Sequence, residues 1–233
     1  MNGKRIEIID GLRGLAVVLM VIHHFLYDLC EFLGAPWWLF SNPVFNFLHY
    51  VFAGLFIMLS GVSSRFSRSN IKRGIKVLIV AFVIYLVTLF MKMPIRFGVL
   101  HLLGFCMVFY GLTYKVWDSI PDLIMPILCV LLLVGSALAV NLIKIDSKFL
   151  WMFGWTYPNF YSADYFPIFP WLFVFLLGTW IGKYIKDEKF PRWFYEAHIP
   201  FFPAIGKKAL IIYIVHQPVL YGLTMAIRHI FIK

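Results

Sequence analysis

The first long apolar run of the sequence, DGLRGLAVVLMVIHHFLYDL, contains acidic, basic and histidine residues. Asp10, Arg13, His24 and Asp28 are four of them, and His23 is the fifth. Ionisable side chains inside hydrocarbon are costly and usually face a bundle interior or a water-filled cavity, so each is a functional candidate. At about 100° per residue, Arg13 and His24 return to nearly the same helical face, about 16 Å apart along the axis. Asp10 lies one turn before Arg13, and Asp28 lies one turn after His24. The four residues therefore form one predicted polar stripe along the helix, and His23 points about 100° away from it.

This stripe could support proton transfer and phosphate binding. A neutral imidazole near the middle of the membrane can take a proton from an attacking amine or hydroxyl, which predicts His24 as a general base. Asp28 could hold the tautomer of that imidazole and stabilise its protonated form. The planar fork of Arg13 suits a phosphate or pyrophosphate. The structural alternative is that Asp10 and Arg13 only anchor the helix and that His24 hydrogen-bonds a neighbouring span.

Three more histidines lie in or beside apolar runs. His101 in IRFGVLHLLG and His216 in IIYIVHQPVL could each reach a site near the midplane. Gln217 and Pro218 follow His216, and proline frees a backbone carbonyl that polar neighbours must satisfy. An interhelical hydrogen bond therefore explains His216 as well as catalysis does. His49 begins the second apolar run near the outer interface, where a lone histidine needs no special explanation.

The composition shows that membrane-spanning helices must position these residues. The chain has 233 residues, is 62% hydrophobic and only 14% charged, whereas soluble domains are about 25% charged and 45–50% apolar. A net charge of +10 would suggest nucleic acid in a soluble protein, but in a membrane protein it usually lies on cytoplasmic loops. We therefore expect no nucleic-acid partner. The cysteines form no C-x-x-C pair, so neither a metal site nor a disulfide framework is expected.

Seven apolar runs are each about 17 to 25 residues long, enough to cross about 30 Å of hydrocarbon. They cover roughly residues 11–30, 44–62, 74–92, 98–114, 121–143, 168–185 and 208–230. The predicted fold is an all-α polytopic membrane helix bundle, a single transmembrane domain over residues 1–233. The first run lacks a signal-peptide cleavage pattern and is expected to remain as the first span. Basic residues concentrate on alternate connecting segments, which predicts a cytoplasmic N-terminus.

Two connecting segments are long. The inner one, KDEKFPRWFYEAHIPFFPAIGKK, is expected to be a solvated loop whose aromatic residues lie at the membrane interface. The outer one, WMFGWTYPNFYSADYFPIFPW, is dense in aromatic residues and proline and carries Asp164 and Tyr165 just before a span. We expect it to form a lid or a substrate platform at the outer mouth of the bundle.

The stretch RIEIIDGLRGLAVVLMVIHHFLYDL resembles the opening of the bacterial relatives of the heparan-alpha-glucosaminide N-acetyltransferase catalytic domain. The likeness continues in order through FAGLFIMLSGVS, IRFGVLHLLG, DYFPIFPWLFVFLLGTWIG and IGKKALIIYIVHQPVL, which together span nearly the whole chain. Arg13, ten intervening residues and His24 also resemble the signature of the acyltransferase-3 family, whose members acylate extracytoplasmic glycans. The luminal segment around the animal enzyme's catalytic histidine is not reproduced, and the nearest histidine is His49.

The resemblance implies a membrane acyltransferase. An acyl group, most often acetyl, would pass from cytoplasmic acyl-CoA to an amine or hydroxyl of an outer glycan or lipid-linked sugar. The implied location is a bacterial plasma membrane, with membrane lipids, acyl-CoA and the acceptor as partners and no metal. Arg13 is implied as a CoA-phosphate or structural contact and His24 as the base or acyl-relaying group. The resemblance also carries over, with less defined roles, His101, Asp164, Tyr165, His216 and Gln217.

The residues predicted for the site fall into three groups. His24, Asp28 and His101 are the predicted catalytic residues. Asp10 and Arg13 are the predicted polar contacts to acyl-CoA or to the protein itself. The candidates on the acceptor side are His49, Asp164, Tyr165, His216 and Gln217.

Two functions of other classes remain as alternatives. A transporter or channel could use intramembrane histidines to relay protons. The lack of a detectable inverted repeat and the odd number of spans argue against it. A non-catalytic membrane partner is the third hypothesis. Release of CoA that depends on an acceptor would distinguish the enzyme from both.

Overall fold

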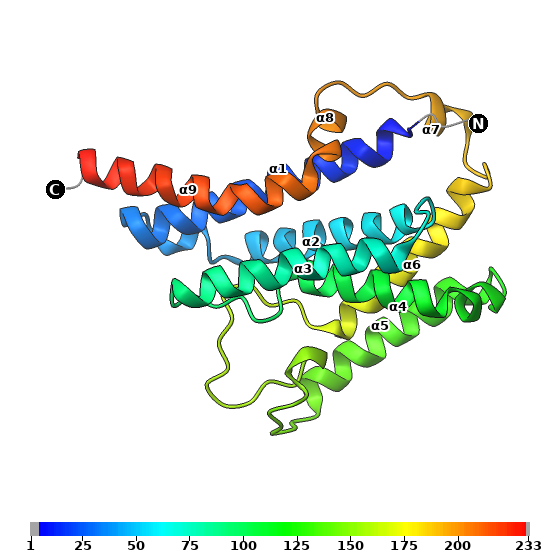
Figure 1. Cartoon of the computed structure of the whole chain (residues 1–233), viewed down its shortest axis with the longest axis horizontal. Helices are drawn as coiled ribbons and strands as arrows, with labels where there is room; N and C mark the ends of the chain where they lie inside the picture. The colour runs from blue at the N-terminus through cyan, green and yellow to red at the C-terminus, as the bar shows by residue number, and fades with distance from the viewer. Residues whose placement is uncertain (1–4, 232–233) are drawn as a thin grey trace. The chain divides into compact units, whose positions relative to one another are not determined.

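The computed structural model describes residues 5–231, which are helical and contain no named strand. In this described part, seven helices are long and apolar enough to cross a membrane, and they confirm the predicted all-α membrane fold (Figure 1). They are α1 (Glu7–Leu33), α2 (Pro43–Ser64), α3 (Asn70–Phe90), α4 (Val99–Ser119), α5 (Ile124–Leu142), α6 (Ile168–Lys186) and α9 (Ala209–Phe231). The shorter elements are η1 (Trp37–Leu39), η2 (Trp151–Phe153), α7 (Arg192–Glu196) and α8 (Phe202–Lys207).

Several helices extend beyond the predicted apolar runs. α3 begins at Asn70 rather than at residue 74, because the Ser69 hydroxyl accepts a hydrogen bond from the Lys72 backbone N–H at 3.3 Å and caps the helix. α4 continues to Ser119 rather than ending near residue 114. Hydropathy marks only the part of a helix that lies in hydrocarbon, whereas backbone hydrogen bonding continues into the interface.

The chain divides into two compact units, and each is described by itself. The first comprises Met1–Leu59 and Phe190–Lys233, and the second comprises Ser60–Lys189. α2 therefore begins in the first unit and ends in the second. The single domain over residues 1–233 stays a prediction.

In the first unit, α1 and α9 lie side by side and run in the same direction. His24 meets His216, with ring centroids 4.8 Å apart, and further along both helices Phe32 meets Tyr221, with ring centroids 5.3 Å apart. A first and a seventh span cross the membrane in the same sense, so this parallel pairing agrees with seven crossings.

The first unit is closed at the beginning of α1 by α8. A Cβ atom at Gly14 would lie 2.1 Å from the carbonyl oxygen of Phe202, and one at Gly206 would lie 1.8 Å from the carbonyl oxygen of Asp10. Only glycine permits backbones to approach this closely. The segment between α6 and α9, expected to be a solvated loop, therefore folds into two short helices and packs on α1.

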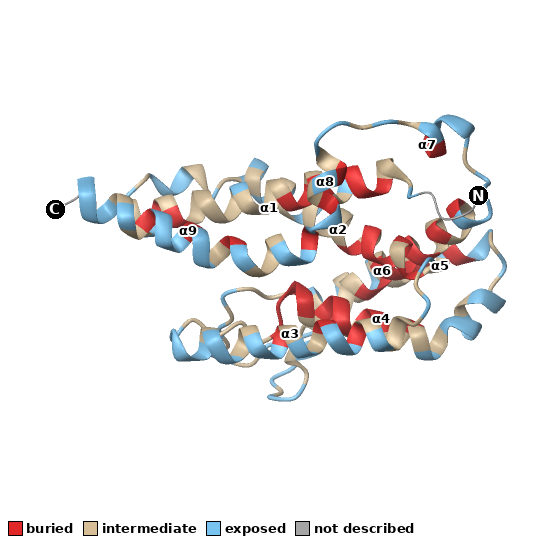
Figure 2. Cartoon of the chain, turned by 45° about the horizontal axis from the view of Figure 1, so that its top comes forward, coloured by how far each residue is buried: buried red, intermediate tan, exposed pale blue. Residues whose placement is uncertain are grey.

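In the second unit, the buried residues gather on α4 and α6, as Figure 2 shows. Leu102 and Cys106 of α4 are fully buried, as are Phe175 and Leu176 of α6. α4 also packs against α3, and α6 packs against α5. α4 and α6 thus form the core of this unit. α3 and α5, the two spans with the highest mean hydropathy, pack on either side of it.

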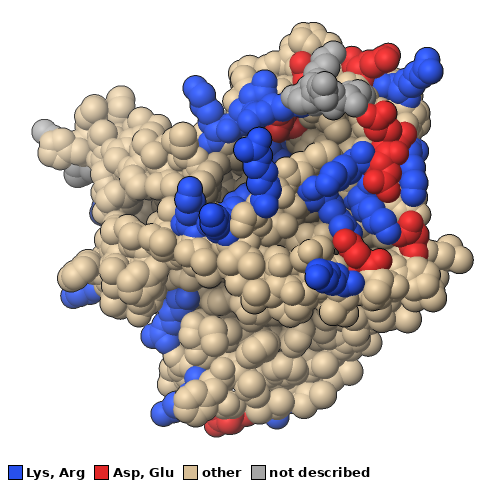
Figure 3. Space-filling view, turned by 45° about the vertical axis from the view of Figure 1, so that its right-hand side comes forward, with Lys and Arg blue, Asp and Glu red and all other residues tan. Residues whose placement is uncertain are grey.

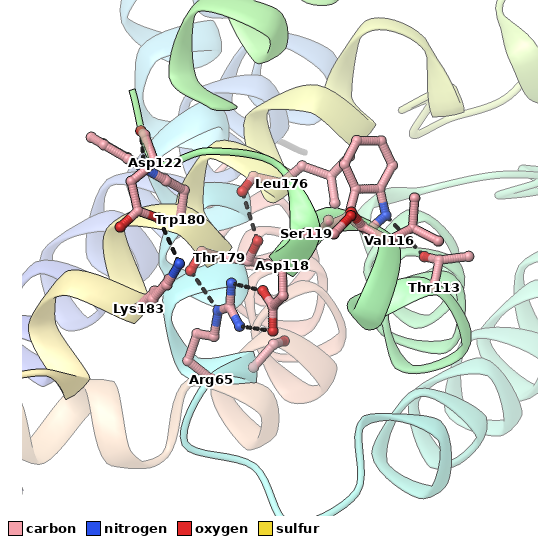
Figure 4. A network of polar contacts seen from close by, with 12 residues as sticks. Arg65, Thr113, Val116, Asp118, Ser119, Asp122, Leu176, Thr179, Trp180 and Lys183 are labelled. Carbon is pink, nitrogen blue, oxygen red and sulfur yellow. Dashed lines mark hydrogen bonds and ion pairs between the residues drawn. The ribbon is translucent and has the colours of Figure 1, made fainter. Parts of the chain in front are cut away.

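A network of charged residues ties together one end of the second unit (Figure 4). Arg65, just after α2, donates from Nε to the Thr179 carbonyl of α6 at 2.8 Å and pairs with Asp118 near the end of α4. Lys183 of α6 pairs with Asp122 in the turn between α4 and α5. The hydrogen bond from Lys183 lowers the pKa of Asp122. These basic residues are used in holding helices together.

Candidate functional site

Four histidines of the first unit follow one another from α2 through α1 to α9. His49 of α2 stacks on His23 of α1, with ring centroids 4.4 Å apart. His23 meets His24 edge to face at 5.8 Å, and His24 meets His216 of α9 in the same way at 4.8 Å. We call these residues, His49, His23, His24 and His216, the histidine chain.

Backbone carbonyls determine which nitrogen of two of these rings is basic. Nδ1 of His24 lies 2.9 Å from the carbonyl oxygen of Met20, and Nδ1 of His216 lies 2.7 Å from that of Tyr213. A carbonyl oxygen only accepts, so we assign the hydrogen to each Nδ1. Each neutral ring then presents the lone pair of Nε2 as its basic atom. Both imidazoles are thus held in one tautomer by their own helices.

Asp28 and Gln217 extend the polar cluster beside His24 and His216. Asp28 is completely buried, and its Oδ1 accepts a hydrogen bond from Nε2 of Gln217 at 3.0 Å. Three buried atoms here have no hydrogen-bond partner within residues 5–231, namely Oδ2 of Asp28, Oε1 of Gln217 and Nε2 of His216. Leaving such atoms unpaired costs about 1–3 kcal/mol each. All three can accept, so a ligand that carries N–H or O–H groups would complement them.

The predicted stripe on α1 has two separate parts. Near the beginning of α1, Nη1 of Arg13 donates to Oδ1 of Asp10 at 2.9 Å, in the region that α8 covers. At the other end, His24 and Asp28 both face α9. The tautomer of His24 was expected to be held by Asp28, but the Met20 carbonyl holds it instead. Asp28 can therefore act on the charge of the site rather than on the orientation of the ring.

The contacts of His23 and His49 were not predicted from the sequence, although His49 was a candidate on the acceptor side. Helical phase set His23 aside because it points away from the stripe of α1, and His49 was explained as an interfacial residue. The two rings nevertheless stack, and His23 also contacts Phe40 with ring centroids 4.7 Å apart. The tandem histidines of α1, together with one in the next span, were the available signal.

The remaining predicted residues lie in the second unit, where they cap α4. Nδ1 of His101 accepts a hydrogen bond from the Gly98 backbone N–H at 3.3 Å and closes the first turn of the helix. Oδ2 of Asp164 accepts from the Val99 N–H at 3.1 Å. Free N–H groups at a helix start need such partners. Both side chains therefore have a structural use at this end of α4.

The aromatic segment before α6 forms hydrogen bonds with neighbouring parts of the second unit. The Tyr165 hydroxyl donates to the Trp151 carbonyl at 2.6 Å, and burial raises the pKa of Tyr165 to about 12. The Ala163 N–H donates to the Pro94 carbonyl at 3.1 Å, which ties the segment to the turn between α3 and α4. These bonds join the segment to neighbouring parts of the second unit, and whether it serves as a lid or as a substrate platform stays a prediction.

The chemistry of the side chains gives no indication of a metal centre. Among residues 5–231, no group of three or more His, Cys, Asp or Glu side chains could hold a metal ion. Although the histidine chain is rich in imidazole, its rings contact one another by stacking and edge-to-face packing.

Comparison with known proteins places this geometry in a family. The family model described as "Heparan-alpha-glucosaminide N-acetyltransferase, catalytic" matches residues 5–218. No curated protein and no solved structure matches the chain significantly. The matched range begins just before α1 and ends just after His216 and Gln217, so it contains the whole histidine chain. The chain therefore belongs to the heparan-alpha-glucosaminide N-acetyltransferase catalytic family, and its general activity is that of a membrane acyltransferase.

Proposed function

We propose that the protein moves an acyl group, expected to be acetyl, from cytoplasmic acyl-CoA to an amine or hydroxyl of an extracytoplasmic glycan or lipid-linked sugar. The observation that carries this proposal is the group of unpaired acceptor atoms on Asp28, His216 and Gln217, next to the ring of His24. Amines and sugar hydroxyls supply the hydrogen-bond donors that these atoms lack. A ligand of this kind would lie within reach of a base.

His24 is the proposed general base. As the acceptor nitrogen or oxygen attacks the thioester carbonyl carbon, Nε2 of His24 takes its proton and the new C–N or C–O bond forms. The C–S bond then breaks, and the proton passes from His24 to the CoA thiolate, which returns the ring to its neutral form. The Asp28 carboxylate stabilises the imidazolium in between. An acyl group held briefly on His24 is the alternative route.

Arg13 is the proposed contact for the phosphates of acyl-CoA. It lies on the same helix as His24, about 16 Å nearer the beginning of α1 at the rise of an α-helix. Its guanidinium pairs with Asp10, which orients the planar fork. The distribution of basic residues predicts a cytoplasmic N-terminus, and the family resemblance implies a bacterial plasma membrane. In that orientation, this end of α1 would face cytoplasmic acyl-CoA.

The experiment that tests the function uses the purified protein in liposomes with acetyl-CoA and matched sugars. Glucosamine offers an amine as well as hydroxyls, whereas N-acetylglucosamine offers hydroxyls alone. We expect one of the two sugars to stimulate the release of CoA, which a thiol reagent measures. Mass spectrometry should show that the same sugar has gained an acetyl group. If glucosamine reacts and N-acetylglucosamine does not, the acceptor group is an amine. If no acceptor changes the release of CoA, acyl transfer to sugars of this kind is excluded.

The histidine chain also favours a second candidate function, a proton pathway. Four imidazoles in series from α2 to α9 are a typical arrangement of intramembrane groups that relay protons. Liposomes that contain the protein and a pH-sensitive dye distinguish the two functions. Proton flux without acyl-CoA would support the pathway, and its absence together with acceptor-dependent release of CoA would support the acyltransferase.

Replacing Arg13 by Gln is expected to weaken acetyl-CoA binding by roughly 10- to 100-fold. A charge-assisted hydrogen bond contributes about 1.5–3 kcal/mol, and each 1.4 kcal/mol corresponds to tenfold in affinity. Binding to the purified variants would be measured by calorimetry. Arg228→Gln, at an exposed position near the end of α9, is the matched control and should bind normally.

A second variant separates phosphate binding from the ion pair on α1. Asp10→Asn removes the partner of Arg13 but keeps its charge, so it should retain most of the affinity for acetyl-CoA. If Arg13→Gln and Asp10→Asn lose affinity equally, the ion pair supports the helix and Arg13 does not contact the donor. Equal affinity of Arg13→Gln and the wild type would also remove Arg13 from donor recognition.

A further inference from the structure

A basic face of α3 in the second unit takes no part in the proposed reaction. Lys72 and Lys76 are both exposed, and their spacing of four residues puts them one above the other on the helix. Arg68, also exposed, comes directly before the capping residue Ser69. We call Arg68, Lys72 and Lys76 the basic face of α3.

The charges of this face are not neutralised by the protein. None of the three side chains forms an ion pair within residues 5–231, although Arg65, Lys183 and Lys189 of the same unit do. The first turn of α3 contains no acidic residue. The start of a helix carries a partial positive charge, so cations there are unfavourable unless an anion lies close. Figure 3 shows Lys and Arg side chains on one view of the surface, some of them with Asp or Glu side chains beside them and some without.

An apolar stripe continues the basic face along the same side of α3. Ile79, Val83 and Phe90 are 59%, 52% and 87% exposed. At about 100° per residue, all three lie within about 20° of the direction of Lys72. From Lys76 to Phe90 the stripe is about 21 Å long at the rise of an α-helix, more than one leaflet of a hydrocarbon core about 30 Å thick. Positive charge thus changes to apolar surface where a lipid's headgroup would give way to its chains.

We propose that this side of α3 binds an anionic phospholipid. The phosphate of the headgroup pairs with Arg68, Lys72 and Lys76, and the acyl chains lie along Ile79, Val83 and Phe90. A soluble phosphate compound would satisfy the charges but would leave the apolar stripe unused. The continuity of the two surfaces on one helical face therefore favours a lipid over a soluble anion. This site is independent of the histidine chain and of the proposed acyl transfer.

The test compares two double variants that remove equal charge at equal spacing. Lys72→Gln/Lys76→Gln changes the basic face, and Lys144→Gln/Lys148→Gln changes exposed lysines that follow α5 in the same unit. Native mass spectrometry would measure the binding of phosphatidylglycerol and phosphatidylcholine to the purified protein. Each basic residue near a membrane surface adds roughly fivefold in affinity for anionic lipid, so the first variant should lose roughly 25-fold for phosphatidylglycerol only. The control variant should bind both lipids as the wild type does.

Two further measurements on the wild type distinguish a bound lipid from a bound soluble anion. The preference of the wild type for phosphatidylglycerol over phosphatidylcholine should decrease when the salt concentration is raised from 0.1 to 1 M. Over this range the Debye length shortens from about 10 Å to about 3 Å, so the attraction between charges is screened. This measurement uses the wild type alone, so it tests the proposal even if a variant fails to fold. Equal binding by both double variants, or a preference that salt does not change, contradicts the proposal. If CoA displaces phosphatidylglycerol from the wild type, the basic face binds a soluble phosphate and the lipid assignment is overturned.

Discussion

Replacing His24 by Ala is expected to reduce acyl transfer by about 10²- to 10⁴-fold, the usual contribution of a general base. The variant loses the Nε2 lone pair of the ring that packs against His216. Initial rates of CoA release at saturating acetyl-CoA and acceptor would measure the effect. A wild-type rate in this variant would show that His24 is not the base.

Two controls separate chemistry from folding in this experiment. His24→Asn keeps an N–H group that can donate to the Met20 carbonyl but offers no basic atom, so it should be as inactive as the alanine variant. His229→Ala, at an exposed position in α9, should transfer at the wild-type rate. If His24→Asn keeps full activity while His24→Ala is unfolded, the ring serves the structure alone.

Replacing Gly206 by Ala is expected to destabilise the protein by about 1–3 kcal/mol or more, the usual cost of overpacking. The added methyl group would lie 1.8 Å from the carbonyl oxygen of Asp10, so the backbones of α8 and α1 must move apart. Thermal unfolding in detergent, followed by intrinsic fluorescence, would show a lower midpoint.

Gly222→Ala is the matched control for this packing. A Cβ atom at Gly222 in α9 would meet nothing within 4 Å. Alanine favours helix over glycine by about 1 kcal/mol, so this variant should be neutral or slightly more stable than the wild type. If the two alanine variants unfold at the same temperature, α8 does not pack on α1 through Gly206.

The membrane spans could be predicted because polar groups are costly in hydrocarbon, so each span appears in the sequence as an apolar run. All seven runs became helices, and only their ends shifted, as at Asn70 and Ser119. The segment between α6 and α9 was harder to predict. Its helices depend on the tight contacts of Gly14 and Gly206, which lie almost 200 residues apart in the chain. Such a contact cannot be seen in a local pattern.

The polar residues of the site were found more readily than their partners. Helical phase correctly put His24 and Asp28 on one side of α1, since both face α9. The helical phase of α1 does not show which other helix packs against this face. The contacts with His216 and Gln217 of α9 therefore could not be derived from it. His101 and Asp164 looked functional by residue type, but the same polar atoms also serve to cap a helix.

The parallel pairing of α1 with α9 has a consequence for biosynthesis. Asp28 and His24 lie on the first of the seven described spans, whereas Gln217 and His216 lie on the seventh, 189 positions after Asp28 for Gln217. A nascent chain therefore has no complete polar cluster until α9 has been made. A chain truncated before α9 would place the Asp28 carboxylate in the membrane without its amide partner. Completing the cluster thus requires that both helices have been inserted.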